Sequence, residues 1–175
     1  DAVDNSLAPF EIGEICIKGP VVMPGYWQDE LASQDTLRGG WLHTGDLGYL
    51  DRDGDLWIVQ RRTDLIVSGG ENVYPAEVEG LLRQHPAVED VCVIGIPDAE
   101  WGQHVAAAVT IRQGQLLTEA SLLEFARSYL AGYKIPRKVF IVEELPLTAS
   151  GKVARQEVVN LLLQRMDSPG GIHAP

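Results

Sequence analysis

The sequence predicts an α+β fold in two parts, and three observations support this. Residues 1–60 consist of short apolar runs separated by glycine and proline turn signals, which is typical of a β-rich segment. From Arg61 onward, short β-branched runs alternate with stretches whose apolar residues recur at helical spacing. The charge also changes, because residues 1–60 carry 11 acidic and 3 basic side chains whereas residues 61–175 carry 14 and 11. We therefore expect a small sheet with flanking helices after a boundary near Arg61.

The β-rich segment contains two clear strand patterns. Residues 13–19 (GEICIKG) alternate apolar and polar side chains, and residues 46–60 predict a hairpin that turns at Asp53-Gly54. This acidic turn is superficially like a calcium loop. The EF-hand pattern, however, requires its glycine one position later and a glutamate six residues after that, where Gln60 stands. Calcium binding is therefore not expected.

The part after the boundary predicts alternating strands and helices. Pro75 suits the first turn of a helix, and Thr118 is a plausible N-cap of another. The expected elements are, in order, a strand over 64–68, a helix from Pro75 to near His85, strands over 88–96 and 104–112, a helix from Thr118 to about Leu130, a strand over 138–145, a helix over 155–166 and a disordered tail, 167–175.

Composition excludes several classes of function. The net charge of −11 argues against non-specific nucleic-acid binding, and no apolar run approaches the ~18 residues that cross a membrane. The first ten residues do not form a signal peptide pattern. Cys16 and Cys92 are flanked by β-branched residues and are interpreted as strand positions, not as a disulfide framework. These observations favour a cytoplasmic protein without a membrane or nucleic-acid partner.

Three segments could carry chemistry: residues 40–54, 61–82 and 144–155. Each has an ordinary structural interpretation when taken alone, as a capped turn, a glycine bulge and an exposed loop before a helix. The stretch TASGK near the end is not a phosphate-cradling P-loop, because Pro146 stands where that motif requires a glycine.

Together and in order, these segments resemble a known family. The stretches GEICIKGPVVMPGYW, WLHTGDLGYLDRDG, RRTDLIVSGGENVYPAEVE and YKIPRKVFIVEELPLTASGKVAR are similar to the C-terminal part of the adenylate-forming acyl- and aryl-CoA synthetases. The resemblance covers roughly residues 11–165. It implies that residues 1–60 end a large adenylation domain, that 61–64 form a hinge, and that 65–166 form a small mobile domain.

The resemblance also implies a two-step reaction. A carboxylic acid attacks ATP to give an acyl-adenylate and pyrophosphate, and coenzyme A then displaces AMP. ATP, coenzyme A and Mg²⁺ are the implied cofactors. The acid pocket, the phosphate loop and most magnesium ligands would belong to an N-terminal domain outside this chain, so the chain alone is expected to be inactive and no metal ligand is assigned within it.

Three residues are implied at the nucleotide. Asp46 matches the carboxylate that accepts hydrogen bonds from the ribose hydroxyls, and Arg61 matches an arginine on the same nucleotide. Lys152 matches the lysine that stabilises charge in the adenylation step. The alternatives are an Asp46–Arg61 pair that only holds the boundary, and an ordinary surface lysine at position 152.

A second set is implied for the hinge and for coenzyme A. Thr63 occupies the hinge position, where a large φ/ψ change must be absorbed. Gly69 would permit a turn, Gly70 would leave room for the pantetheine arm, and Glu71 would offer a polar contact or, with Asn72, cap the helix at Pro75. Aromatic and cationic contacts to coenzyme A are implied for Trp101, Tyr133 and Arg137.

The best single match is an o-succinylbenzoate–CoA ligase, because a hydroxyl at Thr63 follows Arg62. The alternatives left open are a fatty-acid–CoA ligase, an adenylation domain that loads a carrier protein, and a non-catalytic fragment that binds coenzyme A or a partner. Unpaired strand edges in residues 1–60 also make an oligomer possible.

Overall fold

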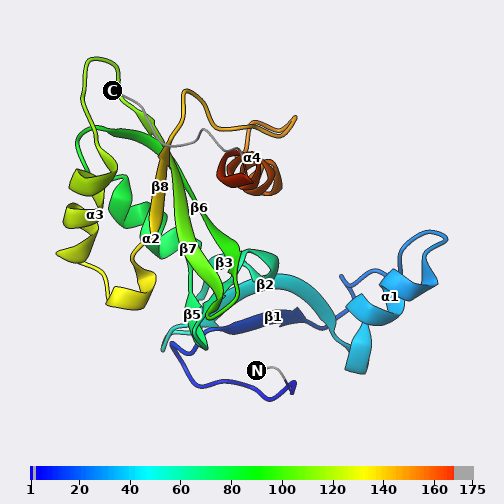
Figure 1. The fold of residues 1–175 in the computed structure, drawn as a ribbon. Coiled ribbons are helices and arrows are strands. Elements are labelled where there is room, and N and C mark those ends of the chain that lie inside the picture. Colours follow the sequence, from blue (N-terminus) through cyan, green and yellow to red (C-terminus); the bar gives the residue numbers. More distant parts are fainter. Residues whose placement is uncertain (2, 168–175) are drawn as a thin grey trace. The chain divides into compact units, whose positions relative to one another are not determined.

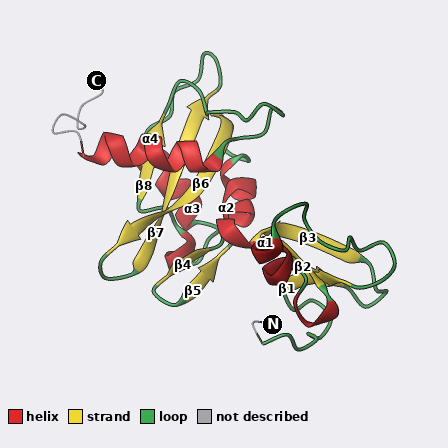
Figure 2. Cartoon of the chain, turned by 90° about the vertical axis from the view of Figure 1, so that its right-hand side faces the viewer, coloured by secondary structure: helices red, strands yellow, loops and turns green. Residues whose placement is uncertain are grey.

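The computed structural model describes residue 1 and residues 3–167. The chain divides into two compact units, Asp1–Thr63 and Asp64–Pro175. We call them the first and the second unit and describe each by itself (Figures 1 and 2). The predicted tail, 167–175, lies outside the described residues except for Asp167, with which the last helix ends.

The first unit is built on an antiparallel sheet of order β1-β2-β3, with β1 at Gly13–Ile17, β2 at Leu42–Leu50 and β3 at Leu56–Arg61. The predicted hairpin is confirmed, since β2 and β3 pair around the turn that contains Gly54. Asp51 orders this turn, because its Oδ1 accepts hydrogen bonds from the amides of Asp53 and Asp55, both at 3.0 Å. The acidic turn is therefore satisfied by its own backbone.

The first unit also contains helical turns that were not predicted. Helix α1 covers Glu30–Thr36 and a 3-10 turn, η1, covers Arg38–Gly40. Asp29 caps α1 by accepting a hydrogen bond from the amide of Ala32 at 2.9 Å. No residue of α1 is buried, so the helix lacks the apolar stripe from which a sequence pattern reveals a helix.

The second unit holds a five-stranded sheet. Its strands are β4 (Ile66–Ser68), β5 (Glu71–Val73), β6 (Val88–Asp98), β7 (Gly102–Ile111) and β8 (Lys138–Ile141). The order is β5-β4-β7-β6, and β8 pairs with β7 in parallel, whereas the other pairs are antiparallel. Strand β5 was not predicted, because it has three residues and two of them are exposed.

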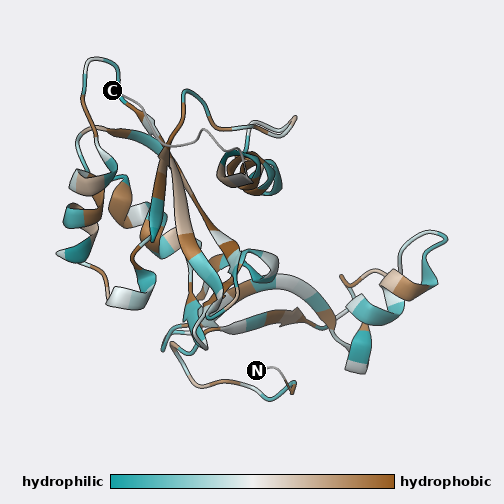
Figure 3. Cartoon of the chain, viewed as in Figure 1, coloured by the Kyte–Doolittle hydropathy of each residue, from teal (hydrophilic) through white to brown (hydrophobic). Residues whose placement is uncertain are grey.

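Helices cover both faces of this sheet (Figure 1). Helices α2 (Pro75–Leu82) and α3 (Glu119–Arg127) pack on one face, and α4 (Arg155–Asp167) packs on the other. The strand residues alternate between the two cores: Val91 and Val93 face α2 and α3, while Cys92 and Ile94 face α4. Much of the length of the central strands is coloured as hydrophobic in Figure 3, as expected for strands buried on both faces. An α+β domain with helices on its faces is therefore confirmed.

Several element boundaries differ from the prediction, and the largest difference in a strand is that β8 ends at Ile141 and not at Leu145. The N-cap at Thr118 is confirmed, since its side chain accepts from the amide of Ser121, but α3 ends at Arg127 and not near Leu130. Helix α2 ends at Leu82, short of His85. The strand predicted over 64–68 starts only at Ile66, because residues Arg62–Asp64 form a 3-10 turn, η2. A third such turn, η3, covers Gly132–Lys134.

Candidate functional site

Asp46 and Arg61 lie opposite each other on β2 and β3 of the first unit. The Nε atom of Arg61 lies 2.9 Å from Oδ1 of Asp46, and Nη1 donates to the carbonyl oxygen of Thr44 at 2.9 Å. Both side chains remain partly exposed, at 61% for Arg61 and 31% for Asp46. The pair is thus held in place by the hairpin, and it presents a carboxylate and a guanidinium to solvent side by side.

Lys152 lies directly after the tip of a narrow loop in the second unit. The two arms of this loop are joined by a bridge between Leu147 and Val153, and the Thr148 amide donates to the Lys152 carbonyl at 2.7 Å. Gly151, at φ +79°, makes the turn possible in a conformation that disfavours residues with a Cβ. The Lys152 side chain is exposed, and among the described residues it has no carboxylate partner. An ammonium group without a partner is free to meet an anionic ligand.

Gly69 and Gly70 form the two-residue turn between β4 and β5. Their φ values are +60° and +86°, as in the tight hairpin turns that favour glycine, and Ser68 pairs with Glu71 across the turn. A Cβ atom at Gly69 would overlap the ring of Trp101, whereas one at Gly70 would meet nothing within 4 Å. Glu71 itself is exposed at the start of β5.

The capping role weighed for Glu71 and Asn72 is not found. The N-cap of α2 is Tyr74, which has an extended backbone and makes no side-chain capping bond. Pro75 at the start of the helix lacks an amide N–H, so one of the groups that a cap would satisfy is absent. Both polar residues instead belong to β5, where they pair with β4.

Trp101 and Arg137 are brought together, although they are 36 positions apart in the sequence. The Arg137 guanidinium carbon lies 4.8 Å from the centre of the Trp101 ring, a cation–π distance. The Nη1 atom of Arg137 also lies 3.4 Å from Oδ2 of Asp98. The Gly69 amide donates to the Trp101 carbonyl at 2.9 Å, so the tryptophan is attached to the glycine turn as well.

Asp98 is a residue of this group that sequence reasoning missed. Its Oδ1 accepts hydrogen bonds from the amides of Trp101 at 2.9 Å and Glu100 at 3.0 Å, which lower the pKa of its carboxyl. Its Oδ2 lies 3.3 Å from Nδ1 of His104. The signal in the sequence was weak, since an aspartate followed two to three residues later by a turn is common in loops.

Tyr133 lies in η3, which packs against β5. Its side chain is 40% exposed, and the Lys134 ammonium lies 5.7 Å from its ring centre. Lys134 also pairs with both carboxylate oxygens of Glu77, at 2.7 and 2.8 Å. The hydrogen bond to Glu77 raises the pKa of Lys134 against the opposing effect of burial. Tyr133 is therefore available to a ligand, whereas Lys134 already has an anionic partner.

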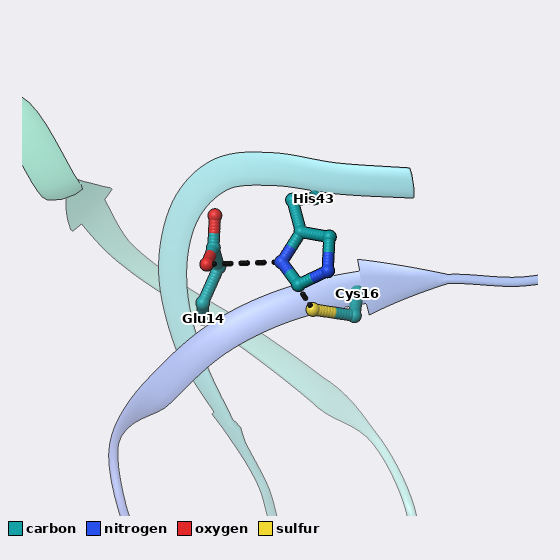
Figure 4. Close-up of side chains that lie close together, drawn as sticks. All are labelled: Glu14, Cys16 and His43. Carbon is teal, nitrogen blue, oxygen red and sulfur yellow. Dashed lines mark hydrogen bonds and ion pairs between the residues drawn. The ribbon is translucent and has the colours of Figure 1, made fainter. Parts of the chain in front are cut away.

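Glu14, Cys16 and His43 form a compact group in the first unit (Figure 4). The Nδ1 atom of His43 lies 3.2 Å from Oε2 of Glu14 and 3.4 Å from Sγ of Cys16. A catalytic triad needs the nucleophile and the carboxylate on different ring nitrogens, whereas here both contact the same one. Burial raises the pKa of the Cys16 thiol, and the negative charge of Glu14 adds to this. The group therefore lacks an activated nucleophile.

The Glu14 carboxylate is instead the centre of a charge network. Its Oε2 lies 3.2 Å from Arg38 and 3.0 Å from Arg62, and its Oε1 accepts a hydrogen bond from the amide of Gly45 at 3.2 Å. Burial alone would raise the pKa of Glu14, but the hydrogen bonds from His43 and Gly45 and the charge of Arg62 lower it. Because two guanidinium groups already neutralise this carboxylate, the network ties β1 to β2 and to the end of the first unit.

A shallow groove of about 710 Å³ lies on the second unit between the end of β8 and α4. It is lined by Ile111, Ile141, Val142, Glu143, Glu144, Pro146, Leu161 and Arg165. None of the residues predicted for catalysis or ligand binding lines it. The groove is thus separate from the predicted chemistry.

Two further observations concern the cysteines and the helices. Both cysteines are free. Within the described part of the chain, no helix is both long enough and apolar enough to cross a membrane.

Comparison with known proteins finds one matching family model and several similar CoA ligases. Residues 77–152 match the family described as AMP-binding enzyme C-terminal domain. A 2-succinylbenzoate–CoA ligase from Geobacillus kaustophilus is 50% identical over 155 residues, which cover 89% of this chain and 32% of that protein. A ligase of the same name from Bacillus cereus is 49% identical over 154 residues, 88% of this chain and 32% of that protein.

Solved structures show the same similarity. The o-succinylbenzoate CoA synthetase (MenE) of Bacillus subtilis, in complex with an acyl-adenylate intermediate, has a TM-score of 0.79 at 45% identity over 87% of this chain and 31% of that one. ATP-bound MatB from Rhodopseudomonas palustris has a TM-score of 0.85 at 37% identity, covering 89% of this chain and 31% of that chain. This chain therefore spans about one third of the length of the relatives it matches.

Proposed function

Because the second unit carries the C-terminal domain of the AMP-binding enzymes, we propose that this chain is the C-terminal third of an ATP-dependent acyl- or aryl-CoA ligase. The whole enzyme would activate a carboxylic acid with ATP and transfer the acyl group from the adenylate to coenzyme A. The proposed acid is o-succinylbenzoate. This choice rests on sequence identity, which is 50% to a 2-succinylbenzoate–CoA ligase and 37% to MatB.

In the first half-reaction, three residues of this chain would act. Asp46 would accept hydrogen bonds from the ribose hydroxyls through its Oδ2 atom, since Oδ1 already pairs with Arg61. Arg61 would contact the same nucleotide with the exposed part of its guanidinium. Lys152 would enter the site from its loop and stabilise negative charge that develops on the acyl and α-phosphate oxygens. Its lack of a carboxylate partner among the described residues supports this role.

In the second half-reaction, the domain would rotate about Thr63 and present another surface. Gly69, Gly70 and Glu71 would line the path of the pantetheine arm, and the open space at Gly70 supports the passage of a ligand past that backbone. Trp101, Tyr133 and Arg137 would contact the nucleotide part of coenzyme A. The cation–π contact between Trp101 and Arg137 supports this assignment, because it places an aromatic face beside a positive charge.

One solved structure of a relative, the Bacillus subtilis MenE, is a complex with ATP and a magnesium ion. We propose that most magnesium ligands of this enzyme lie outside residues 1–175. The described residues contain one group of three metal-binding side chains, Glu14, Cys16 and His43, and a thiol and an imidazole do not suit a cation that prefers oxygen ligands. When bound, the ion would neutralise the phosphates of ATP.

The alternatives differ in the acyl acceptor or in the acid. An adenylation domain for a carrier protein would use the same lysine but a protein-bound pantetheine, and a fatty-acid–CoA ligase would use the same acceptor. A fragment that only binds coenzyme A would need no lysine. Measuring the first half-reaction with o-succinylbenzoate and with fatty acids, and the second with free coenzyme A and with a carrier protein, distinguishes these possibilities.

A chimeric enzyme tests the proposal. Residues 1–175 replace the matching C-terminal third of the Geobacillus kaustophilus relative, to which they are 50% identical. We expect ATP–pyrophosphate exchange that depends on o-succinylbenzoate, and thioester formation with free coenzyme A, whereas the isolated chain gives neither. A folded chimera without either half-reaction would contradict the proposal, as would activity only with a carrier protein.

A further inference from the structure

Arg155 connects two places that the proposed function requires to move together. It is the first residue of α4 and lies three residues after Lys152. Its Nε atom lies 3.3 Å from Oδ2 of Asp64, which is the first residue of the second unit and directly follows Thr63. One guanidinium group thus contacts the exit of the proposed hinge and stands at the base of the proposed catalytic loop.

The same guanidinium is anchored in the interior of the second unit. Its Nη1 atom donates to Oε1 of Glu79 at 2.7 Å and also to the carbonyl oxygen of Val93. Glu79 is buried in α2, with 9% of its side chain exposed, and its Oε1 also accepts the amide of Val93 at 2.8 Å. Burial lowers the pKa of Arg155, but the hydrogen bond and charge of Glu79 outweigh this and raise it, so the group stays charged. A planar guanidinium held at both Nε and Nη1 leaves little freedom to Arg155.

The loop that carries Lys152 starts from this anchor. Ala154, next to Arg155, donates its amide to the Pro146 carbonyl at 2.8 Å, which closes the base of the loop. The bridge between Leu147 and Val153 continues the closure toward the tip. The loop itself is mostly exposed, so its direction depends on its base, where Leu145 and Ala154 are buried in the apolar core and Arg155 adds a polar anchor to Glu79.

We propose that Arg155 is a positioning residue that fixes the Lys152 loop to the hinge exit at Asp64. With this connection, a rotation about Thr63 moves the lysine as part of one rigid body. Without it, Asp64 and the loop can shift separately, and Lys152 is misplaced in the adenylation pose. This proposal rests on the proposed function, because it assigns Lys152 to the first half-reaction.

The test uses the chimera and four variants: Arg155→Met, the conservative Arg155→Lys, Asp64→Asn and the control Arg83→Met. Arg83 also contacts Glu79, at 3.9 Å, but pairs mainly with Asp90 and does not reach Asp64. We expect Arg155→Met to lower ATP–pyrophosphate exchange by about 10²-fold, the scale of a 1 Å misplacement, while thioester formation from supplied acyl-adenylate changes little. Asp64→Asn should give a smaller loss in the same half-reaction, and Arg155→Lys should recover part of the exchange rate that Arg155→Met loses. Arg83→Met should not change the ratio of the two half-reaction rates.

The two proposals fail differently. If the unsubstituted chimera lacks both half-reactions, the proposed function and this inference are overturned together. If it is active and the Arg155 and Asp64 variants reduce both half-reactions equally or not at all, only this inference is overturned. Asp64→Asn keeps the bonds to Glu79 and Val93, so it carries the test even where Arg155→Met does not fold.

Hydrogen exchange on the 175-residue chain supplies a readout that is independent of activity. Arg155→Lys should speed exchange at the amides of Thr148, Gly151 and Ala154, which close the loop, and Arg83→Met should leave them unchanged. Equal protection of these amides in the unsubstituted chain and in Arg155→Lys would overturn the inference.

Discussion

Gly69 and Trp101 are in direct contact: the amide of Gly69 donates to the Trp101 carbonyl at 2.9 Å, and the indole ring fills the space that a Cβ atom at Gly69 would need. The neighbouring Gly70 has the same kind of backbone but open space beside it. A side chain at either glycine would strain the backbone, but only a side chain at Gly69 would also collide with a neighbour. Substitutions at the two positions therefore separate the cost of steric overlap from the cost of backbone strain.

We predict that Gly69→Ala destabilises the chain more than Gly70→Ala does. Both substitutions place a Cβ at positive φ, which costs roughly 1–2 kcal/mol, but only the first also displaces an aromatic ring, at a further cost of about 1–3 kcal/mol. Urea unfolding of the two variants measures the difference. Equal loss of stability would contradict the described contact.

In the chimera, Gly70→Leu should keep pyrophosphate release and lose the coenzyme A product. The reason is the open space beside Gly70, which a leucine side chain would occupy. The two half-reactions are measured separately, with Gly114→Leu, a glycine at φ +78° in a loop away from the predicted site residues, as a matched control. An unchanged thioesterification rate in Gly70→Leu would mean that pantetheine does not pass this backbone.

The stability of the first unit should fall in acid because of Glu14. The folded-state pKa of this carboxyl is lowered from its ordinary 4.5, so its contribution is present above that value and is lost as the pH falls through the folded-state pKa. Glu14→Gln should cost about 1–3 kcal/mol at neutral pH and flatten the acid limb. Urea unfolding between pH 7 and about pH 3 tests this, with the exposed Glu124→Gln as control. If the free energy of unfolding fell as steeply in acid for Glu14→Gln as for Glu124→Gln, groups other than Glu14 would cause the loss of stability.

Cys92 should resist alkylation while the chain is folded. It is buried in β6, and burial raises the pKa of its thiol to about 11, so little thiolate exists near neutral pH. Iodoacetamide labelling at pH 8, read by mass spectrometry, should modify Cys92 only after urea is added. Rapid labelling of Cys92 in the folded chain would contradict the burial described for β6.

Much of the fold was predictable because local patterns agree with it. Thr118 supplies an N-cap, and the β-branched runs of β6 and β7 belong to strands buried on both faces. Helix α1 was not predictable, since it buries no residue, and β5 was hidden by its short length and polar residues. A pattern that depends on burial cannot reveal an element that buries little.

The candidate site was predictable only one residue at a time. The motifs identify Asp46, Lys152 and Trp101, but nothing local indicates that Trp101 contacts Gly69. Neither does any pattern indicate that Asp98 holds the turn before Trp101 and contacts Arg137, 39 residues later. Such relations depend on how β6, β7 and β8 pair, which is a property of the whole sheet.

The half-reaction ratio of Lys152→Ala in the chimera tests the central claim most directly. The proposed function predicts that ATP–pyrophosphate exchange falls by about 10²–10³-fold, the effect of removing one charge-stabilising group, while thioester formation from supplied acyl-adenylate is retained. Arg127→Ala, an exposed cation in the last turn of α3, should leave both rates unchanged. Equal loss of both half-reactions in Lys152→Ala, or no loss of either, would contradict the account.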